Sequence, residues 1–273
     1  MNYPLFLSDF DGTLVKSDGT ISEQNKRAIA RYRAAGGVFA VCTGRMLTSI
    51  RPRLKELGIE EGLVVAYQGA TICDIASGQL LKNDGCSEED VLLVLRILEE
   101  ENLHIHVYTV EDLYANRRDE YLNFYEAVCA VRGTVIADMP LSEYVKREKL
   151  RIVKVLAAVT PDERAALAER LQNTLGEKFF VTCSSQWLVE VMPVGQNKAA
   201  AVQFLSEYYG VPREKIAAIG DQLNDLPMLQ AAGGKFAVAS GEEALKREAI
   251  VVPSCEENGV AYAIEKYAMG EKQ

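Results

Sequence analysis

The stretch FLSDFDGTL, residues 6–14, places Asp9 and Asp11 directly behind a short apolar run. Residues 5–8 have the length and composition of a buried strand. Aspartate is a poor strand former, and its carboxylate is costly to bury without a partner. An Asp-Gly pair at the exit of a strand can also be ordinary turn chemistry. Whether the two carboxylates belong to a site therefore depends on what the other strands carry at their ends.

The bulk composition limits the classes of protein to consider. A chain of 273 residues exceeds the usual size of one domain, so one large or two unequal domains are expected. The formal net charge of −9 argues against nucleic acid or a membrane surface as the main partner, because either would attract a basic face. The sequence shows no signal peptide and no apolar run near the ~18 residues that span a bilayer. The six cysteines form no CxxC pair, so neither zinc nor disulfides are indicated, and a cytoplasmic location is expected.

Strands and helices alternate at both ends of the chain. The expected strands are residues 5–8, 38–42, 63–66, 216–220 and 235–239, and the expected helices are residues 23–35, 46–58, 197–210, 225–233 and 259–268. Ser22 is a plausible N-cap, and a hairpin is expected at 70–81, turning at Ser77-Gly78. This alternation predicts βαβ units and a parallel sheet with helices on both faces.

The pattern changes in the middle of the chain. Helices are expected at 87–103 and 161–176, with strands at 104–110, 151–159, 179–184 and 187–193, the last two spaced as an antiparallel hairpin. The predicted fold class is α/β: a Rossmann-like core domain with a parallel sheet, residues 1–83 and 193–273, interrupted by an inserted α+β cap domain, residues 84–192.

Polar and charged residues that could act in catalysis or ligand binding follow the ends of the predicted parallel strands. They are Asp9 and Asp11 after the first strand, Thr43, Gly44 and Arg45 after the second, Asp221, Asn224 and Asp225 after the strand at 216–220, and Asn197 and Lys198 at the start of the helix behind the insertion. Ligands of open α/β sheets bind at this edge. Four carboxylates, one hydroxyl and one ammonium group are therefore expected to meet there.

Such a concentration of negative charge requires a cation. Two like charges ~4 Å apart repel by about 4 kcal/mol at an effective dielectric constant near 20. Short carboxylate side chains suit Mg²⁺, which usually binds one or two carboxylates together with the phosphate of a substrate. A lysine and a turn of backbone N–H groups suit the phosphate itself. The pattern thus indicates a site for phosphate and Mg²⁺.

Four motifs occur in a fixed order: DFDGT at 9–13, CTGR at 42–45, a lysine that opens a helix at 198, and GDQLND at 220–225. This set resembles the four motifs of the haloacid dehalogenase superfamily of phosphohydrolases. The large insertion between the second and third motifs resembles the Cof-type subfamily, in which an α/β cap closes over the site. The resemblance spans nearly the whole chain.

The resemblance implies a role for each matching residue. Asp9 would be the nucleophile that forms an aspartyl-phosphate, and Asp11 would protonate the leaving oxygen and then activate water. The residues implied to hold the phosphoryl group are Thr43, Lys198 and the backbone near Phe10 and Gly44, with Asn224 contacting the phosphate or a metal-bound water. Those implied to hold Mg²⁺ are Asp9, Asp11 through its carbonyl and Asp221, with Asp225 ligating the ion or supporting it through water or Lys198. Asp225 is as well placed to cap the helix before Pro227, and it can do both.

Two positions depart from the family pattern. Ala199 follows Lys198 where glycine is usual, and Gln68-Gly69-Ala70 stands where Asn-Gly-Ala is usual. Neither change affects a proposed catalytic side chain, so we expect effects only on local packing or on contacts with substrate.

Other conspicuous residues have simpler explanations. His104 and His106 share one face of a strand but have no third ligand in view, so packing or solvent exposure is a better explanation than a metal site. Tyr114, Arg117 and Arg118 could contact a substrate, but a solvated charged loop is favoured. Trp187 is expected in the core of the inserted domain.

The sequence therefore predicts a Mg²⁺-dependent phosphomonoester hydrolase that acts on small phosphorylated metabolites. Sugar phosphates are the first expectation, followed by flavin or pyridoxal phosphates. Two alternatives remain at this point. One is a mutase or phosphotransferase that passes the phosphoryl group to a second hydroxyl, and the other is a protein that binds a phosphorylated ligand without turning it over.

Overall fold

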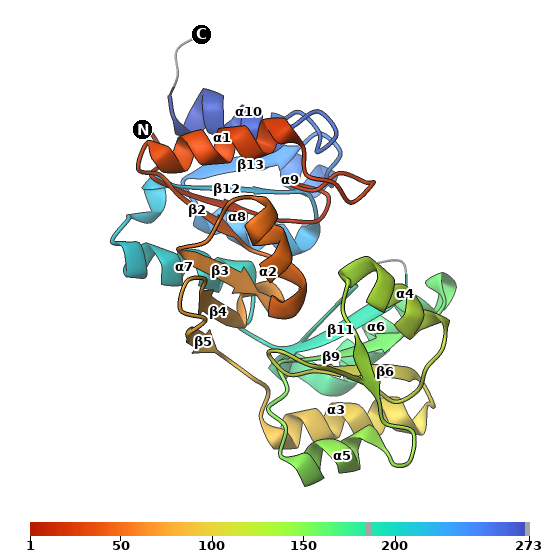
Figure 1. The fold of residues 1–273 in the computed structure, drawn as a ribbon. Coiled ribbons are helices and arrows are strands. Elements are labelled where there is room, and N and C mark those ends of the chain that lie inside the picture. Colours follow the sequence, from red (N-terminus) through yellow and green to blue (C-terminus); the bar gives the residue numbers. More distant parts are fainter. Residues whose placement is uncertain (184–186, 271–273) are drawn as a thin grey trace. The chain divides into compact units, whose positions relative to one another are not determined.

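The computed structural model describes residues 1–183 and 187–270, which form two compact units. The core unit comprises Met1–Gly44, Arg51–Lys82 and Asn197–Gln273, and the cap unit comprises Arg45–Ile50 and Asn83–Gln196. Figure 1 follows the chain through both units. Ser184, the last residue of one predicted strand, lies outside the described residues.

A five-stranded parallel sheet organises the core unit. Its order is β14 (Ile250–Val252), β13 (Gly234–Val238), β12 (Ile216–Gly220), β1 (Leu5–Ser8) and β2 (Val38–Val41). The strand nearest the N-terminus therefore lies inside the sheet, between β12 and β2. The predicted α/β class with a parallel core sheet is confirmed.

Every residue of β1 is buried, which shows that both faces of this sheet are covered. Leu5 and Leu7 point to one side, into a cluster with Leu205 of α7 (Lys198–Tyr209) and Leu229 of α8 (Leu226–Ala231). Phe6 points to the other side, where its ring contacts that of Tyr32 on α1 (Glu23–Ala34). Figure 1 shows α1 and α10 (Gly259–Ala263) on one face of the sheet and α7 and α8 on the other.

Several predicted ends of elements agree with the structure. Ser22 caps α1, because its hydroxyl accepts a hydrogen bond from the backbone N–H of Asn25 at 3.0 Å. The remaining core elements are α9 (Glu243–Lys246) and the short helical turns η1 (Tyr67–Gly69), η3 (Arg213–Lys215), η4 (Leu223–Asp225) and η5 (Ile264–Ala268). The helix α2 (Leu47–Glu56) begins in the cap unit and belongs to the core unit from Arg51 onward.

The strand β3 (Leu63–Ala66) differs from its prediction. It was expected to continue the parallel sheet, but it forms a separate three-stranded sheet with β4 (Thr71–Asp74) and β5 (Leu80–Asn83). Its only pairing with the end of β2 among the described residues is an isolated bridge between Cys42 and Val65. Backbone hydrogen bonds also connect Thr43 to this segment: its N–H donates to Val65 and its carbonyl accepts from Gln68, each at 3.0 Å. The predicted hairpin at 70–81 corresponds to β4 and β5.

The cap unit is built on a six-stranded sheet. Its order is β10 (Phe179–Cys183), β11 (Leu188–Pro193), β9 (Lys154–Ala158), β6 (His104–Tyr108), β7 (Leu113–Ala115) and β8 (Gly133–Val135). One face of the sheet is apolar and packs in one cluster with α3 (Glu88–Glu100), α5 (Leu141–Glu148) and α6 (Pro161–Leu175). The turn η2 (Gly176–Lys178) follows α6, and α4 (Glu120–Cys129) completes the helices. No element had been predicted between residues 113 and 148, where β7, α4, β8 and α5 lie.

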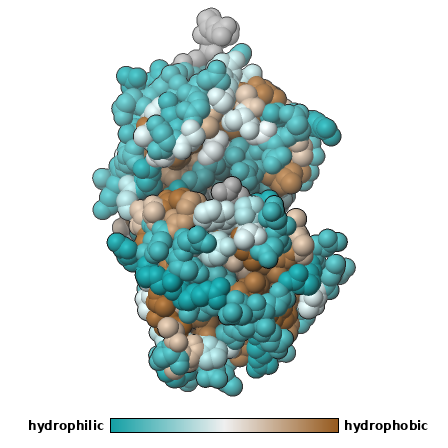
Figure 2. All heavy atoms as spheres, turned by 90° about the vertical axis from the view of Figure 1, so that its right-hand side faces the viewer, coloured by the Kyte–Doolittle hydropathy of each residue, from teal (hydrophilic) through white to brown (hydrophobic). Residues whose placement is uncertain are grey.

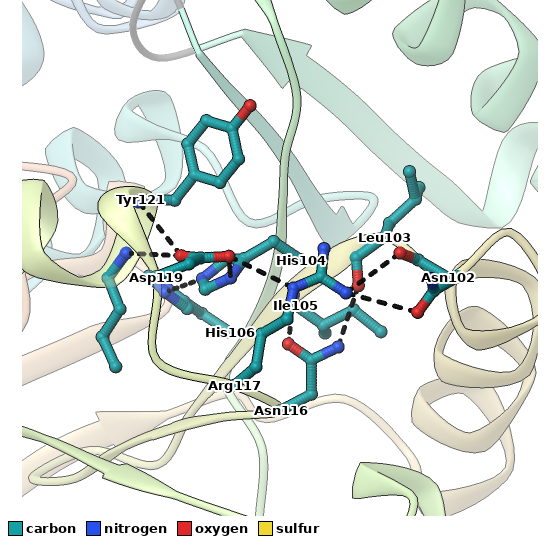
Figure 3. Close-up of polar contacts among 10 residues, drawn as sticks. Asn102, Leu103, His104, Ile105, His106, Asn116, Arg117, Asp119 and Tyr121 are labelled. Carbon is teal, nitrogen blue, oxygen red and sulfur yellow. Dashed lines mark hydrogen bonds and ion pairs between the residues drawn. The ribbon is translucent and has the colours of Figure 1, made fainter. Parts of the chain in front are cut away.

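The second face of the cap sheet carries buried polar side chains. His104 Nδ1 donates to Asp119 Oδ2 at 2.8 Å, so its Nε2 accepts from His106 Nε2 at 2.7 Å. His106 Nδ1 then accepts from the hydroxyl of Tyr108 at 3.0 Å. Figure 3 shows the Asp119 carboxylate between the first turn of α4, His104 and Arg117. The histidines are thus packed and hydrogen-bonded to each other, which confirms the structural explanation.

The two arginines of the predicted charged loop also form hydrogen bonds with acidic side chains. Arg117 donates to Asp119, and Arg118 pairs through two nitrogens with Glu126, each contact at 3.1 Å. Tyr114 lies in β7 rather than in a loop. Trp187 is half-buried, and its ring contacts those of Tyr121 and Phe124.

The face of the molecule in Figure 2 is mainly hydrophilic, with apolar side chains interspersed. Within residues 1–183 and 187–270, no helix is both long enough and apolar enough to cross a membrane.

Candidate active site

The parallel register of β1 and β12 brings two aspartates together. Ser8 is opposite Ile219, and the backbone N–H of Asp9 donates to the carbonyl of Ile219 at 3.0 Å. The next residues along the two strands therefore leave the sheet at the same edge, with Asp221 beside Asp9. Together with Asp225, they offer three carboxylate oxygens that lie within 4.8 Å of one another. We call Asp9, Asp221 and Asp225 the carboxylate trio.

Lys198 supplies the positive charge of the site. Asn197 caps α7, its side chain accepting from the backbone N–H groups of Ala199 and Ala200, so that Lys198 is the first residue of the helix. Its Nζ lies 2.5 Å from Asp9 Oδ1 and 2.6 Å from Asp225 Oδ1. The side chain is fully buried.

Asp225 occupies the N-cap position of α8, but its side chain makes no cap hydrogen bond to that helix. Its Oδ2 instead accepts from the backbone N–H groups of Asp221 and Gln222, at 2.9 and 3.1 Å, while Oδ1 accepts from Lys198. Asp225 therefore fixes the loop that carries Asp221 and orients the lysine at the same time.

Gly12 and Thr13 shape the turn that leaves β1. Thr13 Oγ1 donates to Asp221 Oδ1 at 2.8 Å, which orients that carboxylate from the opposite segment. Gly12 has a φ of +77°, and a Cβ there would lie 2.5 Å from Asp221 Oδ2. Both the backbone conformation and the available space thus require glycine at this position.

Two carboxylates of the trio, those of Asp9 and Asp221, have raised pKa values because they are buried and lie close to other acids. Burial, followed by repulsion from Asp225, raises the pKa of Asp9 well above its usual value. The same two causes raise the pKa of Asp221 to about 6. Burial works against the charged form of Lys198, but attraction to Asp225 and Asp9 outweighs it and raises the pKa of the lysine. The ammonium group stays charged.

Charge and donor type together test whether the trio fits a metal. Three carboxylates face a single ammonium group, so the ionised trio keeps an excess of negative charge in a buried place. Hard oxygen donors on short side chains are the ligands that Mg²⁺ prefers. The residues present therefore fit a hard divalent cation, which would lower the pKa values that mutual repulsion raises.

The other predicted site residues occupy different positions. Thr43 is buried at the end of β2, where its N–H donates to Val65. Phe10 is buried under the guanidinium of Arg53, 5.7 Å from its ring centre. Asp11 is exposed and is not part of the trio. Arg45 donates to Ser49 in its own unit.

Gln68 is a site neighbour that the sequence analysis missed. Its Oε1 accepts from Asn224 Nδ2 at 3.2 Å, and its Nε2 lies so close to Gly44 that a Cβ there would be 2.5 Å away. The side chain thus joins two segments predicted to bind phosphate. The departure at Gln68 had been noted in the sequence, but nothing in the local pattern indicated which side chains it would reach.

Comparison with known proteins gives consistent results. A family model for haloacid dehalogenase-like hydrolases matches residues 6–264. Two phosphatases of 5-amino-6-(5-phospho-D-ribitylamino)uracil from Bacillus subtilis (strain 168), YwtE and YitU, are 28% and 30% identical to this chain; each comparison covers 96% of this chain and 97% of the relative. An HMP-PP phosphatase from Cronobacter sakazakii is 28% identical over 82% of this chain and 80% of its own length.

Solved structures share the same fold. The crystal structure of a haloacid dehalogenase-like hydrolase from Bacteroides thetaiotaomicron is similar with a TM-score of 0.87 and 26% identity, covering 97% of this chain and 99% of the other.

Proposed function

The chain belongs to the family of haloacid dehalogenase-like hydrolases and is a phosphatase of small phosphorylated metabolites. From this premise, we propose that it hydrolyses phosphate monoesters with Mg²⁺. We propose further that the phosphoryl group is bound covalently to Asp9 during the reaction. The observation that supports this most directly is the placement of Asp9. Asp9 directly follows β1, an interior strand of the parallel sheet, and its carboxylate belongs to the trio and contacts the ammonium group of Lys198.

In the first step, an oxygen of Asp9 attacks the phosphorus atom and the bond from phosphorus to the ester oxygen breaks. Asp11 gives its proton to that oxygen, which leaves as an alcohol. Lys198 offsets the negative charge of the phosphoryl group, because its Nζ contacts the carboxylate that attacks.

In the second step, Asp11 takes a proton from water, and the water oxygen attacks the phosphorus of the phosphoryl-aspartate. The bond between phosphorus and Asp9 breaks, which releases orthophosphate and restores the carboxylate. The carboxylate that Asp11 becomes in the first step is the base of the second, so the two steps together restore its proton. Thr43, Asn224 and the backbone at Phe10 and Gly44 hold the phosphoryl oxygens in this proposal.

Asp9, Asp221, Asp225 and the backbone carbonyl of Asp11 would hold the Mg²⁺. When bound, the ion neutralises charge on the phosphoryl group and on the attacking carboxylate. Thr13 keeps Asp221 oriented for this purpose through its hydrogen bond to Oδ1.

Sugar phosphates are the first substrates to test. A phosphorylated ribityl chain, which the names of two relatives specify for those proteins, is the second group. Ranking kcat/KM over a panel of phosphorylated metabolites decides between these groups. Measuring orthophosphate release against isomerised or transferred product separates a hydrolase from a mutase or phosphotransferase.

The decisive experiment compares Asp9→Asn with Asp18→Asn. Asp18 is an exposed acid of the same N-terminal segment whose carboxylate accepts hydrogen bonds from Thr20. Mg²⁺-dependent hydrolysis of p-nitrophenyl phosphate should disappear in Asp9→Asn and persist in Asp18→Asn. Acid-quenched wild-type protein should carry one phosphoryl group by intact mass, and Asp9→Asn none. Hydrolysis that survives in Asp9→Asn would refute the assigned nucleophile.

A further inference from the structure

The turn that follows β3 has an unusual backbone. Tyr67, Gln68 and Gly69 have consecutive φ angles of 49°, 57° and 101°. L side chains rarely adopt this left-handed region, and asparagine and glycine tolerate it best. Strained residues of this kind persist where the surrounding structure determines them, and they concentrate at functional sites.

The surroundings of this turn hold it firmly in place. The N–H of Gln68 donates to the carbonyl of Thr43 at 3.0 Å, and Lys82 Nζ donates to the carbonyl of Gly69 at 2.8 Å. A Cβ on Gly69 would lie 2.5 Å from the carbonyl oxygen of Asn197, so the turn packs directly on the segment before Lys198. The strained turn therefore touches two segments of the site.

The side chain of Gln68 is directed into this region and is only 5% exposed. Its Oε1 is taken by Asn224, which leaves two N–H donors on Nε2 facing Gly44. Within residues 1–183 and 187–270, Nε2 donates to no acceptor. The remaining exposure of this mostly buried side chain leaves room for an acceptor from a ligand at Nε2, and such an acceptor would replace water as the partner of a donor that the protein itself leaves open.

We propose that Gln68 is a further phosphoryl-binding residue, whose Nε2 donates to a phosphoryl oxygen while Asn224 holds its Oε1. This inference rests on the proposed function, because that function places the phosphoryl group at Thr43, Gly44 and Asn224. Glutamine has one methylene more than asparagine, which allows its amide to reach both Asn224 and Gly44 from the strained turn. Asparagine would tolerate the left-handed backbone of this position better, but glutamine has the length needed to place its amide in the site.

A purely structural role for Gln68 makes the opposite prediction for one substitution. Gln68→Asn relaxes the left-handed backbone but withdraws the amide from the site. If Gln68 only supported the turn, this variant would be at least as stable and as active as the wild type. If Gln68 binds the phosphoryl group, the melting temperature should hold or rise while KM for p-nitrophenyl phosphate rises about tenfold.

The second variant, Gln68→Glu, keeps the size of the side chain and replaces the donors with a carboxylate. It should raise KM and the inhibition constant of orthophosphate by more than about tenfold, because a negative charge then faces the phosphoryl group. The matched control is Lys149→Asn, since Lys149 is an exposed residue of the cap unit with a φ of 51°. It relaxes the same kind of backbone and should leave KM unchanged.

A measurement of orthophosphate binding distinguishes a failure of the proposed reaction from a failure of the proposed role of Gln68. Calorimetric titration of orthophosphate with Mg²⁺ present is measured for wild type, Gln68→Asn and Gln68→Glu, independently of turnover. Weaker binding in both variants supports the role of Gln68 even if p-nitrophenyl phosphate is not hydrolysed, in which case only the proposed reaction fails. Equal orthophosphate affinity in all three proteins, or none in any of them, overturns the proposal for Gln68 whatever the activity.

Discussion

The Nζ atom of Lys198 lies between two carboxylates, 2.5 Å from Asp9 Oδ1 and 2.6 Å from Asp225 Oδ1. Asp9 directly follows β1, Lys198 is the first residue of α7, and Asp225 is the last residue of η4 after β12. None of the three side chains is more than 10% exposed. One ammonium group therefore connects three separate segments of the core unit in a place that water barely reaches.

Lys198→Met should lose both stability and activity. Removing one member of a buried ion pair costs about 3–5 kcal/mol in the free energy of unfolding, because the remaining charges stay buried without a partner. The loss should be smaller at pH 5 than at pH 7.5, since Asp9 and Asp221 have raised pKa values and can take up protons. Urea unfolding at the two pH values measures this, and hydrolysis should fall by at least about a hundredfold.

The control for this substitution is Lys246→Met. Lys246 pairs with Glu243 at 3.0 Å on the exposed surface of α9, where solvent screens the attraction and the pair contributes little to stability. An equal loss at both pH values for Lys198→Met, or equal losses for the two variants, would show that the buried carboxylates do not depend on the lysine.

Gly12→Ala should weaken the metal site specifically. Alanine at a φ of +77° costs about 1–2 kcal/mol, and its Cβ would collide with the Asp221 carboxylate. Gly19→Ala is a matched control, because Gly19 has a φ of +81° and a Cβ added there would have no atom within 4 Å. Both variants should be destabilised, but only Gly12→Ala should raise the Mg²⁺ concentration for half-maximal activity. An unchanged Mg²⁺ requirement in Gly12→Ala would contradict the role of Asp221.

Stabilisation by Mg²⁺ should increase with pH. The folded protein raises the pKa of Asp221 from 3.8 to about 6, so without metal its contribution to stability is complete below pH 3.8 and is lost as the pH rises through 6. Mg²⁺ bound to the ionised trio, as proposed, would reverse this loss. The rise in melting temperature on adding Mg²⁺ should therefore be larger at pH 7.5 than at pH 5.5, and Asp221→Asn should reduce that difference. A pH-independent rise would rule out the trio as the binding site.

The cap unit should lose stability in mild acid. Burial lowers the pKa of His104 and lowers that of His106 well below 6.5, with His104 and Lys154 adding to the effect on His106. Their contribution is present above pH 6.5 and is lost as the pH falls through the lowered values. The single tryptophan, Trp187, contacts Tyr121 in the first turn of α4, which Asp119 caps.

Fluorescence of Trp187 is therefore a local probe of this unit. Its thermal transition should move to lower temperature between pH 7 and pH 5, and His106→Gln should weaken that dependence. If the transition first moved below about pH 4, carboxylates rather than the histidines would be responsible.

The sequence predicted the site better than its surroundings. Asp9, Lys198 and Asp221 could be placed together because each follows a strand or opens a helix with clear periodicity, and parallel strands end at a common edge. The pairing of β3 could not be predicted, because a short apolar strand fits a parallel or an antiparallel sheet equally well. The elements between 113 and 148 are short and have weak periodicity, so tertiary packing decides them.

Within the site, the contacts between side chains were the feature that the sequence predicted least well. Asp225 at the start of a helix reads as a cap, yet its carboxylate binds the preceding loop and Lys198 instead. Gln68 reaches Asn224, 156 residues away in the chain, through a backbone conformation that its residue type does not favour. Contacts of this kind depend on the assembled fold, and local propensity carries no information about them.

The interior position of β1 also constrains how the protein is made. Leu5 pairs with Ile216, which a ribosome adds about 210 residues later, roughly ten to forty seconds at ordinary elongation rates. Until then one hydrogen-bonding edge of an apolar strand has no native neighbour, and it invites pairing with other nascent chains. The cap unit, whose residues are contiguous apart from Arg45–Ile50, can complete its own sheet before that moment. Expression at lower temperature or with chaperones that shield early segments should therefore favour this protein more than one whose first strand lies at a sheet edge.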